Sequence, residues 1–145
     1  LAARIRGIYP DAGLFRAVYR VARFRAFPAE TVIPADELSG KKAAALCSIG
    51  APAGFIAMLA QAGMKVSARM MYPDHHAYTA DDYRAIRDAA SRVDVVITTE
   101  KDIAKLHADM LQLDNLIAME IEQVIEPAKQ FIDDVIKYAG LRRTG

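Results

Sequence analysis

The chain has 145 residues, of which 53% are apolar and 26% charged, with 19 basic side chains, 18 acidic ones and a single cysteine. This composition is typical of a soluble globular domain, and it excludes an internal disulfide and the usual zinc cluster of several Cys and His residues. Neither a membrane-spanning helix nor a signal peptide is indicated. Because the sequence begins with Leu1 rather than Met, we expect it to be part of a longer protein.

The first segment is rich in arginine. Residues 1–27 contain six arginines against Asp11 alone, whereas the rest of the chain is acidic, which argues against a nucleic-acid partner. Arg16, Arg20 and Arg23 recur at helical spacing beside an apolar stripe. This pattern predicts a basic amphipathic helix, facing either a partner domain or an anionic lipid surface.

Residues 28–40 show no clear period and contain prolines and a glycine, so we expect a linker there. A boundary near Leu38 would then separate an arginine-rich segment with its linker, residues 1–37, from a domain formed by residues 38–145.

Short apolar runs alternate with helical patterns after the linker. We expect strands at 42–47, 64–71, 93–98 and 116–122, and helices at 53–62, 79–92, 102–111 and 127–139. Such alternation predicts an α/β fold, because parallel strands need crossovers and helices usually supply them. The fold class expected is a three-layer Rossmann-like sheet of about four mostly parallel strands, flanked by helices and preceded by a helical or irregular N-terminal extension.

Local signals agree with these elements. Pro52 stands at the expected first position of a helix, and Thr79 with Asp82 fits a capping box. Gly63 and Gly140 stand just past helices, where a left-handed conformation is often required.

Three polar or glycine-containing segments, 48–52, 72–76 and 98–102, each follow a predicted strand. The carboxyl ends of parallel strands share one edge of a sheet, and ligands bind at that edge. The sequence therefore predicts a site there.

The first segment contains Ser48 and Gly50. The sequence has neither G-x-G-x-x-G nor a G-x-x-x-x-G-K-[ST] P-loop, so a tight strand-to-helix turn is favoured over a phosphate cradle.

The second segment carries Asp74, His75 and His76. A carboxylate beside an imidazole suits a general base, although adjacent side chains of an extended segment point to opposite faces, so only one histidine can serve a given site. Alternatively, both histidines only cap the sheet edge. D-H-H also names a family of manganese phosphoesterases, but their G-G-G-H motif is absent, and we predict no metal site.

The third segment runs Thr98, Thr99, Glu100, Lys101 and Asp102. Taken alone, it is best explained by helix capping, with Thr99 as N-cap and Asp102 three residues on. Lys101 would then share an exposed helix face with the lysine four residues later.

The remaining candidates are Cys47, His107 and three tyrosines. We expect Cys47 to be an unreactive core residue and His107 to lie on the surface. Tyr72, Tyr78 and Tyr83 either line a pocket near the histidines or pack in the core.

The three segments together are familiar. S-I-G-A-P-A-G-F at 48–55, Y-P-D-H-H-A-Y-T at 72–79 and V-V-I-T-T-E-K-D-I-A-K-L at 95–106 match in order and spacing. Over about residues 38–107 the chain resembles the C-terminal half of the tetraacyldisaccharide 4'-kinase family. Departures are Ser48, where glycine is usual, and Ala51, where a polar residue is common.

The resemblance implies a two-domain cytoplasmic enzyme, peripheral to the inner membrane, that acts in lipid A biosynthesis. It would transfer the ATP γ-phosphate, with Mg²⁺, to the 4'-hydroxyl of a tetraacyldisaccharide 1-phosphate. The P-loop and the magnesium-binding acids belong to the family's N-terminal domain, so the present chain is not expected to catalyse the transfer alone.

In the family, a C-terminal histidine works with an N-terminal aspartate as the catalytic base pair. The matching position is His75, and Asp74 would orient it. Ser48, Gly50, His76 and residues 98–102 are expected to shape the interdomain cleft. The competing hypothesis is a stand-alone, non-catalytic α/β module that binds a nucleotide or a protein at the same edge; a P-loop upstream of Leu1 would separate the two.

Overall fold

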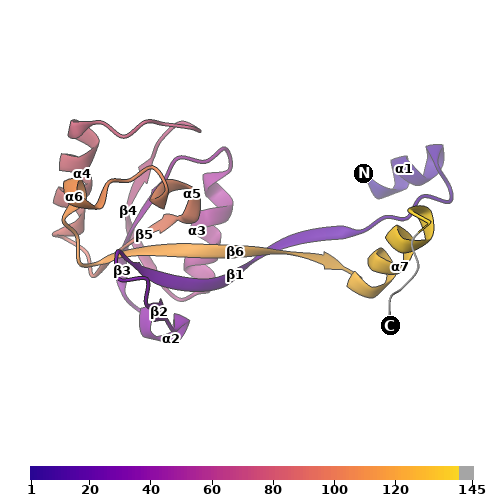
Figure 1. Ribbon diagram of the computed structural model, residues 1–145, viewed down its shortest axis with the longest axis horizontal. Coiled ribbons are helices and arrows are strands. Elements are labelled where there is room, and N and C mark those ends of the chain that lie inside the picture. Colours follow the sequence, from indigo (N-terminus) through magenta and orange to yellow (C-terminus); the bar gives the residue numbers. More distant parts are fainter. Residues whose placement is uncertain (141–145) are drawn as a thin grey trace. The chain divides into compact units, whose positions relative to one another are not determined.

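The computed structural model describes residues 1–140, so the last five residues of the expected 38–145 domain lie outside the described part (Figure 1). The helices are α1 (Ala2–Ile8), α2 (Ala35–Leu38), α3 (Pro52–Gln61), α4 (Ala80–Ala90), α5 (Glu100–Ile103), α6 (Ala108–Leu111) and α7 (Ala128–Tyr138). The strands are β1 (Arg16–Phe27), β2 (Val32–Ile33), β3 (Lys42–Cys47), β4 (Lys65–Met71), β5 (Val95–Thr99) and β6 (Leu116–Glu126).

The strands form one sheet in the order β2-β1-β6-β5-β3-β4. β3 pairs in parallel with both β4 and β5, and β5 pairs in parallel with β6, whereas β2 runs antiparallel to β1. The predicted α/β class with a mostly parallel sheet is confirmed. The expected four strands are β3 to β6, and the structure adds β1 and β2.

Both faces of the central strands are buried, because alternate residues of β3 enter two separate cores. Ala43, Ala45 and Cys47 pack on one side with Phe55 and Leu59 of α3. The residues between them, Ala44 and Leu46, pack on the other side with Tyr83 and Ile86 of α4. Figure 1 shows α3 and α4 on opposite sides of these strands. This is the three-layer arrangement that continuous apolar strands predict.

The predicted basic helix over Arg16 to Arg23 is wrong, because this segment belongs to strand β1. Arg23 and Arg25, two positions apart, lie on one face of a strand, and both form ion pairs with the buried carboxylate of Glu120 on β6. Phe24 between them is buried in the core on the α3 side. Pairing with Glu120 and burial of Phe24 therefore fix the segment as a strand.

The single helix predicted over residues 102–111 is also replaced, by the short helices α5 and α6. Likewise, the expected linker contains β2 and α2. The other predicted strands and helices of residues 42–139 are present, with ends that differ by a few residues. The capping box of Thr79 and Asp82 is confirmed, as are the positive φ angles of Gly63 and Gly140.

The chain divides into two compact units. Residues 21–121 form one unit, which contains β3, β4, β5 and both cores, and residues 1–20 with 122–140 belong to the other. In the second unit, Phe15 packs edge-on against Phe131 of α7. No helix within residues 1–140 is long and apolar enough to cross a membrane.

Gly63 and Gly54 form a matched pair for a test of stability. Gly63 follows α3 with φ +81°, and a Cβ there would lie 2.5 Å from Ser39 Oγ. Gly63→Ala should therefore reduce the free energy of unfolding by about 1–2 kcal/mol. Gly54 lies in α3 with nothing within 4 Å of an added Cβ, so Gly54→Ala should raise it by about 0.5–1 kcal/mol. Urea unfolding measures both, and equal effects of the two substitutions would contradict the assigned backbone conformations.

Candidate functional site

The site lies where the strand order reverses. The chain passes from β3 through α3 to β4 on one side of β3, and then returns through α4 to β5 on the other side. In open α/β sheets, ligands bind beside the carboxyl ends of the strands at such a reversal. Ser48 follows β3, and Asp102 lies in the helix that follows β5. The side chains of these two residues are hydrogen-bonded to each other at the reversal.

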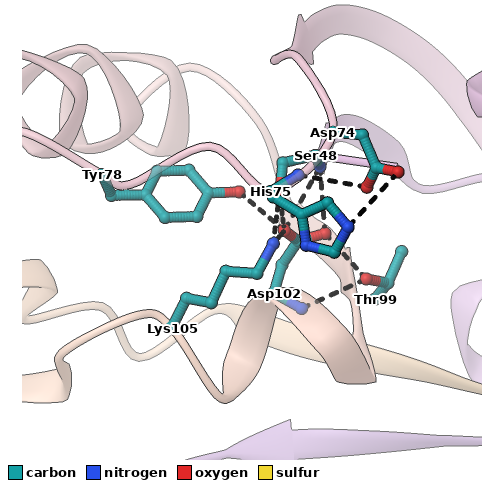
Figure 2. Close-up of polar contacts among 7 residues, drawn as sticks. All are labelled: Ser48, Asp74, His75, Tyr78, Thr99, Asp102 and Lys105. Carbon is teal, nitrogen blue, oxygen red and sulfur yellow. Dashed lines mark hydrogen bonds and ion pairs between the residues drawn. The ribbon is translucent and has the colours of Figure 1, made fainter. Parts of the chain in front are cut away.

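Asp102 is fully buried and accepts hydrogen bonds from the first and third predicted segments and from Tyr78, which lies two residues beyond the second (Figure 2). The Ser48 hydroxyl donates over 2.5 Å and the Ser48 backbone N–H over 3.1 Å. Thr99 Oγ1 donates over 2.7 Å, and the hydroxyl of Tyr78 donates over 3.0 Å. The carboxylate of Asp102 thus connects the segments after β3, β4 and β5 at one point.

These hydrogen bonds favour the ionised form of Asp102. Burial alone would raise the pKa of Asp102, but the donors, Ser48 and Thr99 first among them, outweigh burial and hold the pKa below its usual value. Burial and the charge of Asp102 raise the pKa of Tyr78 strongly, so this phenol stays protonated and remains a donor. Burial also raises the pKa of Cys47 to about 11, which agrees with its expected place as an unreactive core thiol.

Lys105 belongs to this group, contrary to the prediction that it shares an exposed helix face with Lys101. Helix α5 ends at Ile103, and the Lys105 ammonium donates to Ser48 Oγ over 2.7 Å while it lies 3.5 Å from Asp102. Its charge balances the buried carboxylate. The sequence interpretation missed Lys105 and the hydroxyl of Tyr78 as members of the site; the spacing of three residues between Asp102 and Lys105 was the available signal.

The two histidines lie in different environments. His76 stacks on Tyr72 with ring centroids 4.5 Å apart, and its Nε2 lies 2.9 Å from an Asp82 oxygen. Its side chain is 24% exposed. His75 is 90% exposed and has φ +60°, a conformation uncommon for a residue with a side chain. His76 therefore packs against the protein, and His75 projects outward.

Asp74 lies beside His75 and close to the first segment. Its carboxylate accepts the backbone N–H of His75 over 3.1 Å, and the other carboxylate oxygen lies 3.8 Å from His75 Nε2, which exceeds hydrogen-bond distance. A Cβ added to Gly50 would lie 3.7 Å from Asp74. The turn after β3 and the histidine segment are thus neighbours (Figure 2).

The other residues predicted to shape the cleft, 98–102, do not all join the hydrogen-bonded group around Asp102. Thr98 is buried, and its hydroxyl has no hydrogen-bond partner among the described residues. Glu100 and Lys101 are exposed, and Glu100 accepts the backbone N–H of Ile121 over 3.4 Å. Thr99 caps α5 as expected. Of the five residues 98–102, only Thr99 and Asp102 join the hydrogen-bonded group. The surface position expected for His107 is observed.

Within residues 1–140, no group of three or more His, Cys, Asp or Glu side chains is arranged to hold a metal ion. The arrangement offers instead an exposed imidazole on an anchored loop, beside a carboxylate and above a buried, charge-balanced network. Such a group can accept a proton from a substrate hydroxyl.

The fold and the position of the site define an α/β domain of the kind that binds ligands at a reversal of strand order. A model of the family "Tetraacyldisaccharide-1-P 4'-kinase" matches residues 13–138, and the chain belongs to this family. The family predicted from the three sequence segments is therefore confirmed.

Curated relatives of this chain carry the name of the same family. Tetraacyldisaccharide 4'-kinase of Rhodopseudomonas palustris strain BisB5 is 36% identical over 108 residues, which are 73% of this chain and 31% of the relative. The protein of the same name from Desulfatibacillum aliphaticivorans is 44% identical over 101 residues, 68% of this chain and 27% of the relative. The chain spans under a third of the length of these curated relatives.

A solved structure shares the fold. The "apo" form of LpxK from Aquifex aeolicus, crystallised in complex with ATP, aligns with a TM-score of 0.53 at 18% identity. The alignment covers 91% of this chain and 40% of that one.

The hydrogen bonds that Asp82 accepts from the Thr79 backbone and from His76 make the stability of the fold depend on pH. Hydrogen bonds from the Thr79 backbone N–H and from His76 lower the pKa of Asp82 from 3.8 to about 2. A depressed carboxyl pKa stabilises the fold above the unfolded-state pKa, and that contribution is lost as the pH falls from about 4 to 2. The advantage of the unmodified chain over Asp82→Asn should therefore shrink by about 2 kcal/mol between pH 5 and pH 2. Urea unfolding of both proteins measures it, and a constant difference would contradict the assignment.

Proposed function

We propose that the chain is the C-terminal part of a tetraacyldisaccharide 4'-kinase, which in its complete form transfers the γ-phosphate of ATP to the 4'-hydroxyl of a tetraacyldisaccharide 1-phosphate. Family membership supports this reaction, and ATP in the Aquifex aeolicus LpxK crystal supports the nucleotide. The single observation that carries the proposal is the 90% exposed imidazole of His75, held on an anchored loop at the ligand edge of the sheet.

His75 is the proposed general base. As the 4'-hydroxyl oxygen forms its bond to the γ-phosphorus, the hydroxyl proton passes to an imidazole nitrogen, and the bond between the γ-phosphorus and ADP breaks. Asp74 lies 3.8 Å from His75 Nε2 and would favour the imidazolium that results. His76, tied to Asp82, keeps the loop in place rather than reacting.

The described residues do not fit Mg²⁺ or the phosphates of ATP. No metal-binding cluster occurs within residues 1–140, and the sequence contains no P-loop motif. We therefore assign both to another domain of the complete enzyme and expect no transfer by this chain alone. An upstream G-x-x-x-x-G-K-[ST] in the same reading frame would support this assignment, whereas an initiation codon directly before Leu1 would favour the non-catalytic binding module.

Residues 1–37 are proposed to connect the domains, and residues 38–145 to carry the site. Arg20, Arg23 and Arg25 pair with glutamates of β6. They are therefore less available to a lipid surface than their sequence spacing indicates. The exposed arginines of α1 remain available for a peripheral contact with anionic lipid at the cytoplasmic face of the inner membrane.

His75→Ala should lower kcat of the complete kinase by about 10²–10⁴-fold, because the reaction loses its base. His75→Asn serves as a second variant, since Asn tolerates a positive φ. Both should change the free energy of unfolding by less than about 0.5 kcal/mol, because the side chain is exposed. His107→Ala is the matched control: His107 is another exposed histidine, with no side-chain capping bond. Turnover of the His75 variants within a few-fold of the control would remove His75 from the mechanism.

A further inference from the structure

We propose that Asp102 is a positioning residue for the transfer: through Tyr78 its buried carboxylate fixes the loop of residues 72–79, and so holds His75 toward the reacting hydroxyl. This inference rests on the proposed function. Asp102 is fully buried, so it would act on His75 indirectly, through the hydrogen bond that it accepts from Tyr78.

Before the capping box of Thr79, the loop between β4 and α4 is held at three points. The Tyr72 backbone N–H donates to the Cys47 carbonyl over 2.9 Å, which ties the start of the loop to β3. His76 Nε2 contacts Asp82, which ties the middle to α4. The Tyr78 hydroxyl donates to Asp102, which ties the end to the segment after β5. His75 lies between the first and last of these anchors.

The third anchor differs from the others because it crosses the strand-order reversal. The first anchor connects the loop to β3, and the second connects it to α4, the helix that directly follows the loop. Among the hydrogen bonds within residues 1–140, the bond from Tyr78 connects the loop to the segment after β5, where Asp102 also accepts hydrogen bonds from Ser48 of the turn after β3. Loss of this bond would leave the loop free to shift relative to that side of the site. A displacement near 1 Å of a catalytic group can lower a rate by about 10²-fold.

A carboxylate suits this place better than a neutral side chain. Four donor groups, from Ser48, Thr99 and Tyr78, point at its two oxygens, and the Lys105 ammonium lies 3.5 Å away. An amide in the same position would present its own N–H groups to some of these donors. Because the donors favour the ionised form, the network does not change protonation near neutral pH. The network should therefore affect the rate through the position of the loop, and not through a change in the protonation of Asp102.

Tyr78→Phe tests the inference in the complete kinase, since it removes one hydrogen bond and keeps the ring that packs against Tyr72 and His76. Tyr83→Phe is the matched control, because Tyr83 is a buried tyrosine whose hydroxyl accepts a backbone N–H from His107. We expect Tyr78→Phe to lower kcat about tenfold and leave KM for both substrates within about twofold. The pH profile should keep its shape. Tyr83→Phe should leave kcat within about twofold.

Hydrogen exchange supplies a readout independent of activity. Amides of residues 74–77 should exchange faster in Tyr78→Phe than in Tyr83→Phe, as mass spectrometry of the complete kinase would show. Equal kcat values for the two variants would overturn the positioning role, whether or not exchange differs. Unchanged exchange at residues 74–77 would overturn it as well. Retained activity of His75→Ala in the same assay would instead reject the proposed base, so the two failures are distinguishable.

Discussion

The need to satisfy one buried carboxylate organises the edge of this sheet. Asp102 has no access to water, so its charge must be balanced within the protein or the fold would lose several kcal/mol. The required donors come from segments that lie 24 and 54 residues away in the chain, and from the lysine three residues on. The network therefore fixes where the three loops meet, and the exposed His75 takes its position from that meeting point.

Much of the fold followed from the sequence because its signals are local. The apolar runs of β3 and β5 and the capping box before α4 each act within a few residues, and these elements were predicted nearly to their ends. β1 was not, because its arginines fit a helical period as well as a strand. The choice between them is made by Glu120, nearly 100 residues away, whose carboxylate pairs with Arg23 and Arg25.

The same distinction applies to the site. The shared edge could be predicted, since parallel strands bring their carboxyl ends together. Asp102 was predicted as a capping residue, and it does accept a hydrogen bond from Thr99. Its bond with Tyr78 and the bond of Lys105 with Ser48 could not be predicted, because they join residues 24 and 57 positions apart through the packing of different loops. The separate environments of His75 and His76 agree with the expectation that only one of two adjacent side chains serves a given site, whereas no local motif specified the positive φ of His75.

The titration of Asp102 tests the central claim most directly. A ¹³C NMR titration of the carboxyl carbons of the chain, assigned by comparison with Asp102→Asn, would give the pKa of this residue. The network predicts a pKa below the ordinary value of 3.8, because the hydrogen bonds outweigh the effect of burial. A pKa above 3.8 would mean that burial dominates and that the carboxyl is a poorly satisfied buried acid. In that case it could not serve as the fixed point from which the three loops, and His75 with them, are positioned.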